Sequence, residues 1–200
     1  LSPYHLWDYG FDYYAPQSFE AEDGRRIHIS WMGMPDCEEY TNPTIKDGWQ
    51  HCFTFPREVF VKDGKVCQKP VRELDAKKQQ LQDVQNELTQ SGCPVYEVNV
   101  DGIKENHFQA VLSDELILDY ENGRFQMHFT NKSKTSVSAG RSLRYAKVDT
   151  LENVKILADT SSVEVFVNDG EFVFSTRYYP NDYKIVVHSP SAHITFDKIQ

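Results

Sequence analysis

The sequence predicts an all-β protein interrupted by one helical segment near its middle. The first observation is a series of short runs in which apolar and polar residues alternate, each bounded by turn residues such as Asp-Gly or Asn-Gly. The second is a change of period between residues 70 and 90, where the apolar residues take helical spacing. These patterns divide the chain into a β-rich part, a connector and a second β-rich part.

The first β-rich part covers residues 7–71. Residues 27–32 and 50–55 form strand-like runs, and Asp63-Gly64 lies between residues 59–61 and 66–68. An Asp-Gly pair between two alternating runs is a strong hairpin signal, because both residues tolerate the positive φ of a tight turn. We therefore expect a hairpin at Asp63-Gly64.

Residues 70–90 have the pattern of an amphipathic helix, which Gly92 and Pro94 would end. This segment could form a coiled-coil dimerisation helix or a connector that lies on a neighbouring domain. It holds only about three heptads and has a lysine at one seam position, so a connector is favoured. The apolar residues on one side of the helical wheel are Val71, Leu74, Leu81, Val84 and Leu88.

Residues 95–200 return to strand patterns. Alternation is clear over residues 95–100, 125–129 and 163–167, and Asp-Gly or Asn-Gly pairs separate several of the runs. Short strands at intervals of about ten residues are typical of a β-sandwich. We expect this part to be an independent sandwich.

Composition excludes several classes of function. The chain has 21 Lys and Arg against 30 Asp and Glu, a net charge of −9, and no basic cluster. Nucleic acids and anionic membranes both require clustered positive charge, so neither is an expected partner. No apolar run reaches the roughly 20 residues of a membrane span, so we expect a soluble protein.

The four cysteines, Cys37, Cys52, Cys67 and Cys93, form no closely spaced pair of the kind that binds structural zinc. A disulfide stays open, but reduced thiols in a cytoplasmic protein are the simpler interpretation. The chain opens without Met or a signal-like segment, which implies that the true N-terminus lies outside this sequence.

Local motifs carry more information than composition. Residues 8–19 read DYGFDYYAPQSF, residues 25–33 read RRIHISWMG, and residues 48–58 read GWQHCFTFPRE. They resemble the segments DYGxDFYAPQTF, RRILIGWM and GWxxxLTLPREL of glycoside hydrolase family 32, the family of invertases, sucrose-6-phosphate hydrolases, inulinases and levanases. Residues 68–74 (QKPVREL) and 161–180 (SSVEVFVNDGE to STRYYP) resemble later segments of that family. The motifs occur in family order along nearly the whole chain.

This resemblance implies a five-bladed β-propeller followed by a β-sandwich. Residues 1–70 would then be the last strands of the propeller, residues 71–92 a short helical linker, and residues 93–200 the sandwich. The earlier blades would be a missing N-terminal partner of this chain.

The resemblance also implies a retaining glycosidase, which uses two carboxyl groups roughly 5 Å apart. In the family, the nucleophile is the Asp of NDPNG, the acid/base is the Glu of ECP, and an RDP Asp binds sugar hydroxyls. None of these strings occurs here. We therefore expect no catalytic residue, metal or cofactor in this chain, and no hydrolysis of sucrose by the chain alone.

A wall of the sugar pocket would remain. The family resemblance assigns pocket-lining positions to Tyr14 and Trp31, whose rings could stack on the apolar face of a fructoside. For Asp8 and Asp12 three roles stay open: binding a sugar hydroxyl, orienting a neighbour, or ending a strand in a turn. The histidines His28, His51, His107, His128, His188 and His193 are interpreted as structural.

Two hypotheses from different classes follow. The first is the C-terminal part of a β-fructosidase acting on sucrose or sucrose-6-phosphate, in which the unaccompanied propeller strands expose an edge that could pair with a second copy. The second is a free-standing sandwich that binds a carbohydrate or mediates oligomer contacts. A binding module has no need for propeller motifs in residues 1–70, so the first is favoured.

Overall fold

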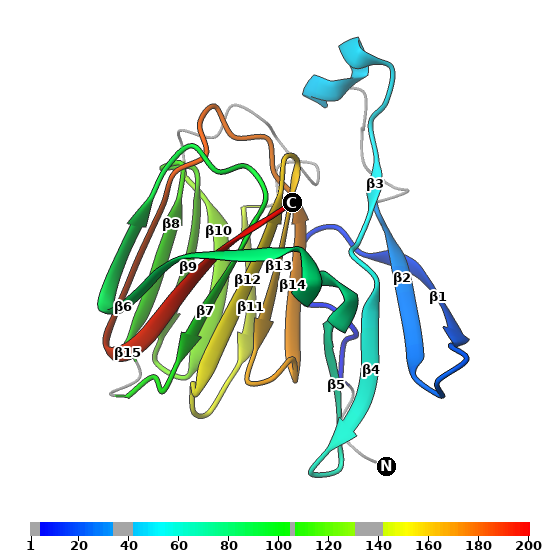
Figure 1. Ribbon diagram of the computed structural model, residues 1–200, viewed down its shortest axis with the longest axis horizontal. Coiled ribbons are helices and arrows are strands. Elements are labelled where there is room, and N and C mark those ends of the chain that lie inside the picture. The colour runs from blue at the N-terminus through cyan, green and yellow to red at the C-terminus, as the bar shows by residue number, and fades with distance from the viewer. Residues whose placement is uncertain (1–4, 34–41, 105–106, 131–141) are drawn as a thin grey trace.

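The computed structural model describes residues 5–33, 42–104, 107–130 and 142–200, and nearly all of its regular structure is antiparallel β-strand (Figure 1). A five-stranded sheet contains the strands before residue 71, and a ten-stranded sheet contains the strands after residue 77. The all-β class predicted from the sequence is confirmed. The described residues contain no helix with the length and apolar character that a membrane crossing requires.

The five-stranded sheet has the order β1-β2-β4-β5, with β3 also paired to β2. Asp63 and Gly64 have φ values of 50° and 76° and connect β4 to β5, which confirms the predicted hairpin. All residues of β1 are exposed, and β1 pairs only with β2 in the described part of the chain. The strands are β1 (Tyr14–Glu20), β2 (Arg26–Met32), β3 (Cys52–Phe53), β4 (Arg57–Lys62) and β5 (Lys65–Pro70), and a 3-10 helix, η1 (Pro43–Asp47), precedes β3.

The ten-stranded sheet has the order β11-β10-β9-β8-β15-β7-β12-β13-β14, with β6 paired to β15. It curls so far that its two ends approach each other, as Figure 1 shows. Its strands are β6 (Lys78–Gln90), β7 (Tyr96–Asp101), β8 (Phe108–Leu112), β9 (Leu116–Glu121), β10 (Arg124–Phe129), β11 (Leu143–Lys147), β12 (Asn153–Asp159), β13 (Ser162–Val167), β14 (Phe172–Arg177) and β15 (Ile185–Ile199).

The curl depends on β15, which belongs to both halves of the sheet. Its first residues pair with β8 and its last residues with β7, while β6 follows it on the other side. Between these stretches Ser191 and Asn86 adopt φ values of 66° and 72°, and the Ser191 amide donates to Asn86 Oδ1 at 2.7 Å. This paired irregularity bends both strands together, as bulges do where a sheet turns a corner.

The main hydrophobic core lies inside the curled sheet. It includes Phe108, Phe125, Phe174 and Phe196, each at most 1% exposed. A smaller cluster joins Leu157, Phe166 and Val173 of β12–β14 with Ile199 at the end of β15, and Phe55 and Leu74 pack against it. Because both faces of β13 and β14 are covered, every residue of these two strands is buried.

The helix predicted over residues 70–90 is wrong. Only η2 (Arg72–Lys77) is helical, as a 3-10 helix, and residues 78–90 form strand β6. Val84 and Leu88 are an even number of residues apart, so they lie on one face of a strand as well as of a helix. The long strand β15 would otherwise expose one edge, and pairing with β6 satisfies its backbone groups. Tertiary pairing therefore overrides the local helical pattern.

Candidate functional site

A row of aromatic side chains crosses one face of the five-stranded sheet. Tyr14 on β1 is the register partner of Trp31 on β2, and Trp31 is the register partner of Phe53 on β3. Register partners project from the same face, so the three rings form a continuous strip. Tyr14 is 49% exposed and Phe53 is 66% exposed, whereas Trp31 between them is half-buried. We call these three residues the aromatic row.

Local backbone features shape this row. Ala15 has a φ of 48°, and the register shifts between Tyr14 and Gln17, so a bulge directs the Tyr14 ring. Gly33 lies under the Trp31 indole, where an added Cβ would be 2.4 Å from two of the ring atoms. The glycine therefore provides the space in which the indole lies.

The ring contacts are edge-on. The ring centroids of Tyr14 and Trp31 are 6.1 Å apart at 76°, and those of Trp31 and His51 are 4.9 Å apart at 88°. The His51 Nε2 lies 3.2 Å from Gln50 Nε2. His51 therefore contacts the Trp31 indole edge-to-face, which helps to hold the indole in one orientation.

The structure thus brings together Tyr14 and Trp31, two of the residues that the sequence singled out. It adds Phe53 and His51, which lie within the predicted strand of residues 50–55. Phe53 joins the row because of its pairing with Trp31, and the pairing register of two strands cannot be read from either strand alone. A row appears only when three strands are aligned.

Asp8 lies away from this surface, in the interface between the two sheets. Its side chain is fully buried, and its Oδ1 accepts hydrogen bonds from the amides of Gly10 (2.8 Å) and Ser175 (2.9 Å). Its Oδ2 accepts from Ser175 Oγ (2.6 Å) and from Arg57 Nη1 (3.3 Å). Gly10 and its neighbours run beside β14, and a Cβ on Gly10 would be 2.1 Å from the Ser175 carbonyl oxygen.

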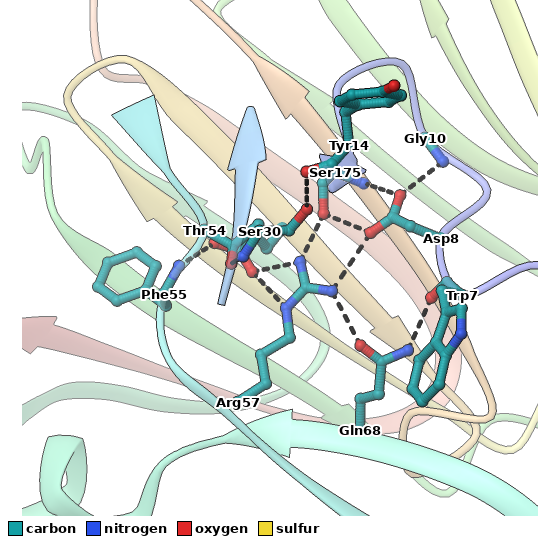
Figure 2. Close-up of polar contacts among 11 residues, drawn as sticks. Trp7, Asp8, Gly10, Tyr14, Ser30, Thr54, Phe55, Arg57, Gln68 and Ser175 are labelled. Carbon is teal, nitrogen blue, oxygen red and sulfur yellow. Dashed lines mark hydrogen bonds and ion pairs between the residues drawn. The ribbon is translucent and has the colours of Figure 1, made fainter. Parts of the chain in front are cut away.

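Arg57 is the centre of this interface (Figure 2). Its Nε and Nη2 donate to Glu164 Oε2 at 2.8 and 2.5 Å, and Nη2 also donates to Ser175 Oγ at 2.6 Å. Its Nη1 donates to Gln68 Oε1 at 3.0 Å and to Asp8. These bonds use all the N–H groups of a guanidinium. Arg57, Glu164 and Asp8 are all fully buried, so this is a saturated charge network inside the protein.

Two carboxylates share one guanidinium in this network. Burial raises the pKa of Asp8 and of Glu164, while the Arg57 charge and donated hydrogen bonds offset part of that effect. Each of these hydrogen bonds has the carboxylate oxygen as its acceptor. In the intact network, a proton added to an oxygen would therefore point toward a group that is itself donating. The arrangement therefore binds the ionised acids and depends on Arg57 to compensate them.

Asp12 forms a second buried pair between the same two parts of the chain. Its Oδ1 accepts from Arg177 Nε (3.2 Å) and Nη2 (2.8 Å), and its Oδ2 accepts from the Arg177 amide (2.9 Å). Both side chains are at most 1% exposed. The placements of Asp12 and Asp8 favour the second of the roles left open by the sequence, in which the carboxylate orients a neighbour. A hydroxyl-binding role for either residue stays a prediction.

His28 lies beside the Arg57 network, with its ring centroid 5.7 Å from Trp7 and 6.2 Å from Tyr13. It is 2% exposed, and its Nε2 has no hydrogen-bond partner among the residues that the structure describes. Burial, and then the nearby Arg57 charge, lower its pKa to about 4, while Gln68 raises it in part. The folded state therefore keeps this histidine neutral.

We predict a pH-dependent loss of stability from His28. Above the ordinary histidine pKa of 6.5, His28 is neutral in both states and does not lower the free energy of unfolding. As the pH falls from 6.5 toward 4, the free energy of unfolding decreases, because His28 takes up a proton in the unfolded chain but stays neutral in the folded one. The loss approaches about 3 kcal/mol at pH 4. Urea unfolding across this range should show a steeper decline for the natural chain than for His28→Leu.

The exposed His188 provides the control for that measurement, since His188→Leu should retain the slope. Subtracting the two profiles separates His28 from the carboxyl groups that titrate in the same range. Parallel profiles for the natural chain and His28→Leu would contradict the prediction.

Cys52, Cys67 and Cys93 are free thiols, and Cys37 lies outside the described residues. Burial raises the pKa of Cys52 to about 12 and raises the pKa of Cys67 and Cys93 as well. Thiols in this state are poor nucleophiles. No group of His, Cys, Asp and Glu side chains in the described ranges could hold a metal ion. Among those residues, the structure therefore offers no metal cluster and no activated thiol beside the aromatic row.

The fold and the aromatic row define an all-β protein with a strip of aromatic side chains on one face of its smaller sheet. Two family models match: the glycosyl hydrolases family 32 N-terminal domain over residues 2–70 and the glycosyl hydrolases family 32 C-terminal domain over residues 108–200. The chain belongs to glycoside hydrolase family 32.

Curated relatives include the raffinose invertase of Escherichia coli, 37% identical over 186 residues, and the sucrose-6-phosphate hydrolase of Bacillus subtilis, 34% identical over 188 residues. Each alignment covers 86% of this chain but only 38% and 37% of the relative. The chain thus spans well under half the length of these relatives.

Among solved structures, the sucrose-6-phosphate hydrolase of Lactobacillus gasseri superposes with a TM-score of 0.85 at 24% identity, covering 97% of this chain and 42% of that one. A GH32 β-fructofuranosidase mutant of Bombyx mori, solved in complex with sucrose, superposes with a TM-score of 0.79 at 19% identity, covering 98% and 42%. This likeness shows that the fold is shared.

Proposed function

We propose that these 200 residues are the C-terminal part of a β-fructosidase that hydrolyses the fructosyl bond of sucrose or sucrose-6-phosphate. In this proposal the five-stranded sheet is the last blade of a catalytic propeller, and the ten-stranded sheet is the sandwich that follows it. The aromatic row carries the proposal, because it places Tyr14 and Trp31 side by side on the exposed face of a family 32 chain.

The proposed role of this chain in the reaction is to bind and orient the sugar. Trp31 offers an aromatic face to the apolar side of a fructosyl ring, and Tyr14 adds a hydroxyl that can hydrogen-bond to the sugar. Holding the ring in one orientation lowers the entropic cost of attack by a carboxylate. The nucleophile and the acid/base of the retaining mechanism would come from residues outside this sequence.

The exposed strand β1 supports the same proposal. All its residues are exposed, including Phe19 at 58%. An apolar side chain on a fully exposed strand is a surface that earlier blades of a propeller could cover. A second copy of this chain could cover it instead, so the oligomeric state of the purified chain belongs in the same experiment.

The test is glucose release from sucrose and from sucrose-6-phosphate. Three samples are compared: the chain alone, the chain mixed with the separately expressed N-terminal part of the E. coli raffinose invertase, and a fusion of that part to Leu1. We expect the chain alone to match a buffer blank and the fusion or the mixture to turn over sucrose. In the active sample, Trp31→Ala should lower kcat/KM by roughly fivefold to 150-fold, because a stacked ring contributes on the order of 1–3 kcal/mol.

Trp49→Ala is the matched control. Trp49 is a 43% exposed tryptophan in the same part of the chain, and it lies outside the aromatic row. Turnover by the chain alone would overturn the assignment of the catalytic acids to other residues. Equal effects of Trp31→Ala and Trp49→Ala would overturn the role of the row. A folded chain that is silent in every sample but binds a glycan would favour the carbohydrate-binding module.

A further inference from the structure

A line of hydrogen bonds connects the aromatic row to the ten-stranded sheet (Figure 2). The Phe55 amide donates to Glu164 Oε1 on β13 at 2.6 Å. One residue earlier, the Thr54 amide donates to the Ser30 carbonyl at 2.9 Å, and the Ser30 amide donates to Thr54 Oγ1 at 3.1 Å. The junction between β3 and β4 is therefore bonded to β13 on one side and to β2 on the other.

Ser30 is the end of this line that touches the row. Its Oγ donates to the Tyr14 carbonyl at 2.7 Å, and its own backbone continues directly into Trp31. Ser30 is 1% exposed and Thr54 is 3% exposed, so water does not compete for these bonds. One buried serine thus holds the backbones of two of the three aromatic residues.

Glu164 is the fixed end of the line. Its Oε2 accepts two hydrogen bonds from Arg57, and its side chain is fully buried. Hydrogen bonds to both oxygens orient this carboxylate, and they place its Oε1 against the Phe55 amide. By contrast, within the described residues β3 pairs with β2 at two positions, Trp31/Phe53 and Met32/Cys52. The position of β3 therefore depends on the bonds at its C-terminal end.

We infer that Thr54 and Glu164 are positioning residues, through which the ten-stranded sheet sets the spacing of the aromatic row. Thr54 fixes β3 against β2, which determines how Phe53 lies beside Trp31. Glu164 fixes the same junction against β13, which holds the row in one position relative to the ten-stranded sheet. An effect of these residues on sugar binding rests on the proposed function. Their effect on the position of the aromatic row rests on the hydrogen bonds alone.

The test uses the 200-residue chain carrying 5-fluorotryptophan, with the Trp31 ¹⁹F resonance assigned through Trp31→Phe. Thr54→Val keeps the size of the side chain but removes the acceptor of the Ser30 amide, and Thr54→Ser retains that acceptor. We expect Thr54→Val to shift or broaden the Trp31 resonance and to speed exchange of the Ser30 amide about tenfold. Thr54→Ser should restore both signals.

A second pair of variants tests the other end. Glu164→Gln should move the Trp31 resonance and speed exchange of the Phe55 amide. Glu97→Gln is the control, because Glu97 is an equally buried glutamate of the ten-stranded sheet whose partners are Lys78, Lys155 and Asn99. It should lower stability without moving the Trp31 resonance. Thr54→Val leaves the charge network intact, so it decides the matter even where Glu164→Gln unfolds the chain.

Three outcomes are decisive. An unchanged Trp31 resonance in Thr54→Val overturns the inference, and so does an equal shift in Thr54→Ser or Glu97→Gln, because the effect would then follow general loss of stability. A shift confined to Thr54→Val and Glu164→Gln supports it. Adding fructose to the natural chain separates this inference from the proposed function. If Thr54→Val moves the Trp31 resonance but fructose does not, the sugar contact is overturned and the positioning role is retained.

Discussion

Replacing Arg57 with methionine is expected to lower the free energy of unfolding by about 3–5 kcal/mol. The variant removes the cation that compensates Asp8 and Glu164, both of which are fully buried. It also removes a donor to Gln68 and Ser175. The free energy of unfolding of a domain is only about 5–15 kcal/mol, so this single substitution removes a large part of it.

Protonation of the two acids would offset part of this cost, because Arg57 bonds to Asp8 Oδ2 and Glu164 Oε2 and its loss leaves these oxygens able to carry a proton. The amides of Gly10, Ser175 and Phe55 would keep their bonds to Asp8 Oδ1 and Glu164 Oε1. By contrast, replacing the whole charge group by apolar residues would leave these amides without partners. Arg57→Met is therefore the clean test, measured by urea unfolding at neutral pH.

Lys62→Met is the matched control for Arg57. Lys62 also forms an ion pair across the two sheets, with Asp169, but the two side chains are 51% and 45% exposed. A surface pair of this kind contributes on the order of 0.5 kcal/mol. Losses of similar size in Arg57→Met and Lys62→Met would contradict the interpretation that burial makes the Arg57 network essential.

Replacing Gly170 with alanine is expected to cost about 3 kcal/mol. Gly170 has a φ of 83°, where an alanine is strained by roughly 1–2 kcal/mol. Its new Cβ would also lie 1.7 Å from the Gln68 carbonyl oxygen on β5, and backbone cannot move aside as a side chain can. The variant would push β5 away from the β13–β14 turn and weaken the bond from the Gln68 amide to the Gly170 carbonyl.

Gly102→Ala separates the two parts of that cost. Gly102 has a φ of 68°, but nothing lies within 4 Å of a Cβ placed there. It should lose only the conformational part, about 1 kcal/mol. Thermal or urea unfolding of both variants measures the difference, and equal losses would show that the two sheets do not press together at Gly170.

Strand alternation and turn chemistry were enough to predict the all-β class and the hairpin between β4 and β5. Asp63 and Gly64 encode their hairpin locally, because the positive φ values of the turn are available to few other residues. The segment of β6 shows the limit of this reasoning. Val84 and Leu88 suit either period, and the choice was made by β15, which follows about 100 residues later in the chain and needs a partner.

Some residues of the candidate site could likewise be predicted from the sequence, and others could not. Tyr14 and Trp31 were named from motifs, whereas Phe53 entered the aromatic row only through the register of β3 on β2. For Asp8 and Asp12 the sequence left several roles open, and the structure encloses each with an arginine distant in sequence, Arg57 and Arg177. A carboxylate has the same chemistry at either place, and only burial distinguishes a binding group from a structural one.

By itself, the sequence determined the all-β class, the turns, the family and the absence of the family's catalytic motifs from these residues. These properties depend on local patterns and on strings that can be read directly. The tertiary structure decided that residues 78–90 are a strand, that Arg57 joins two sheets, and that the aromatic row is continuous across three strands. All three depend on contacts between residues far apart in the chain, whose free energy no local pattern contains.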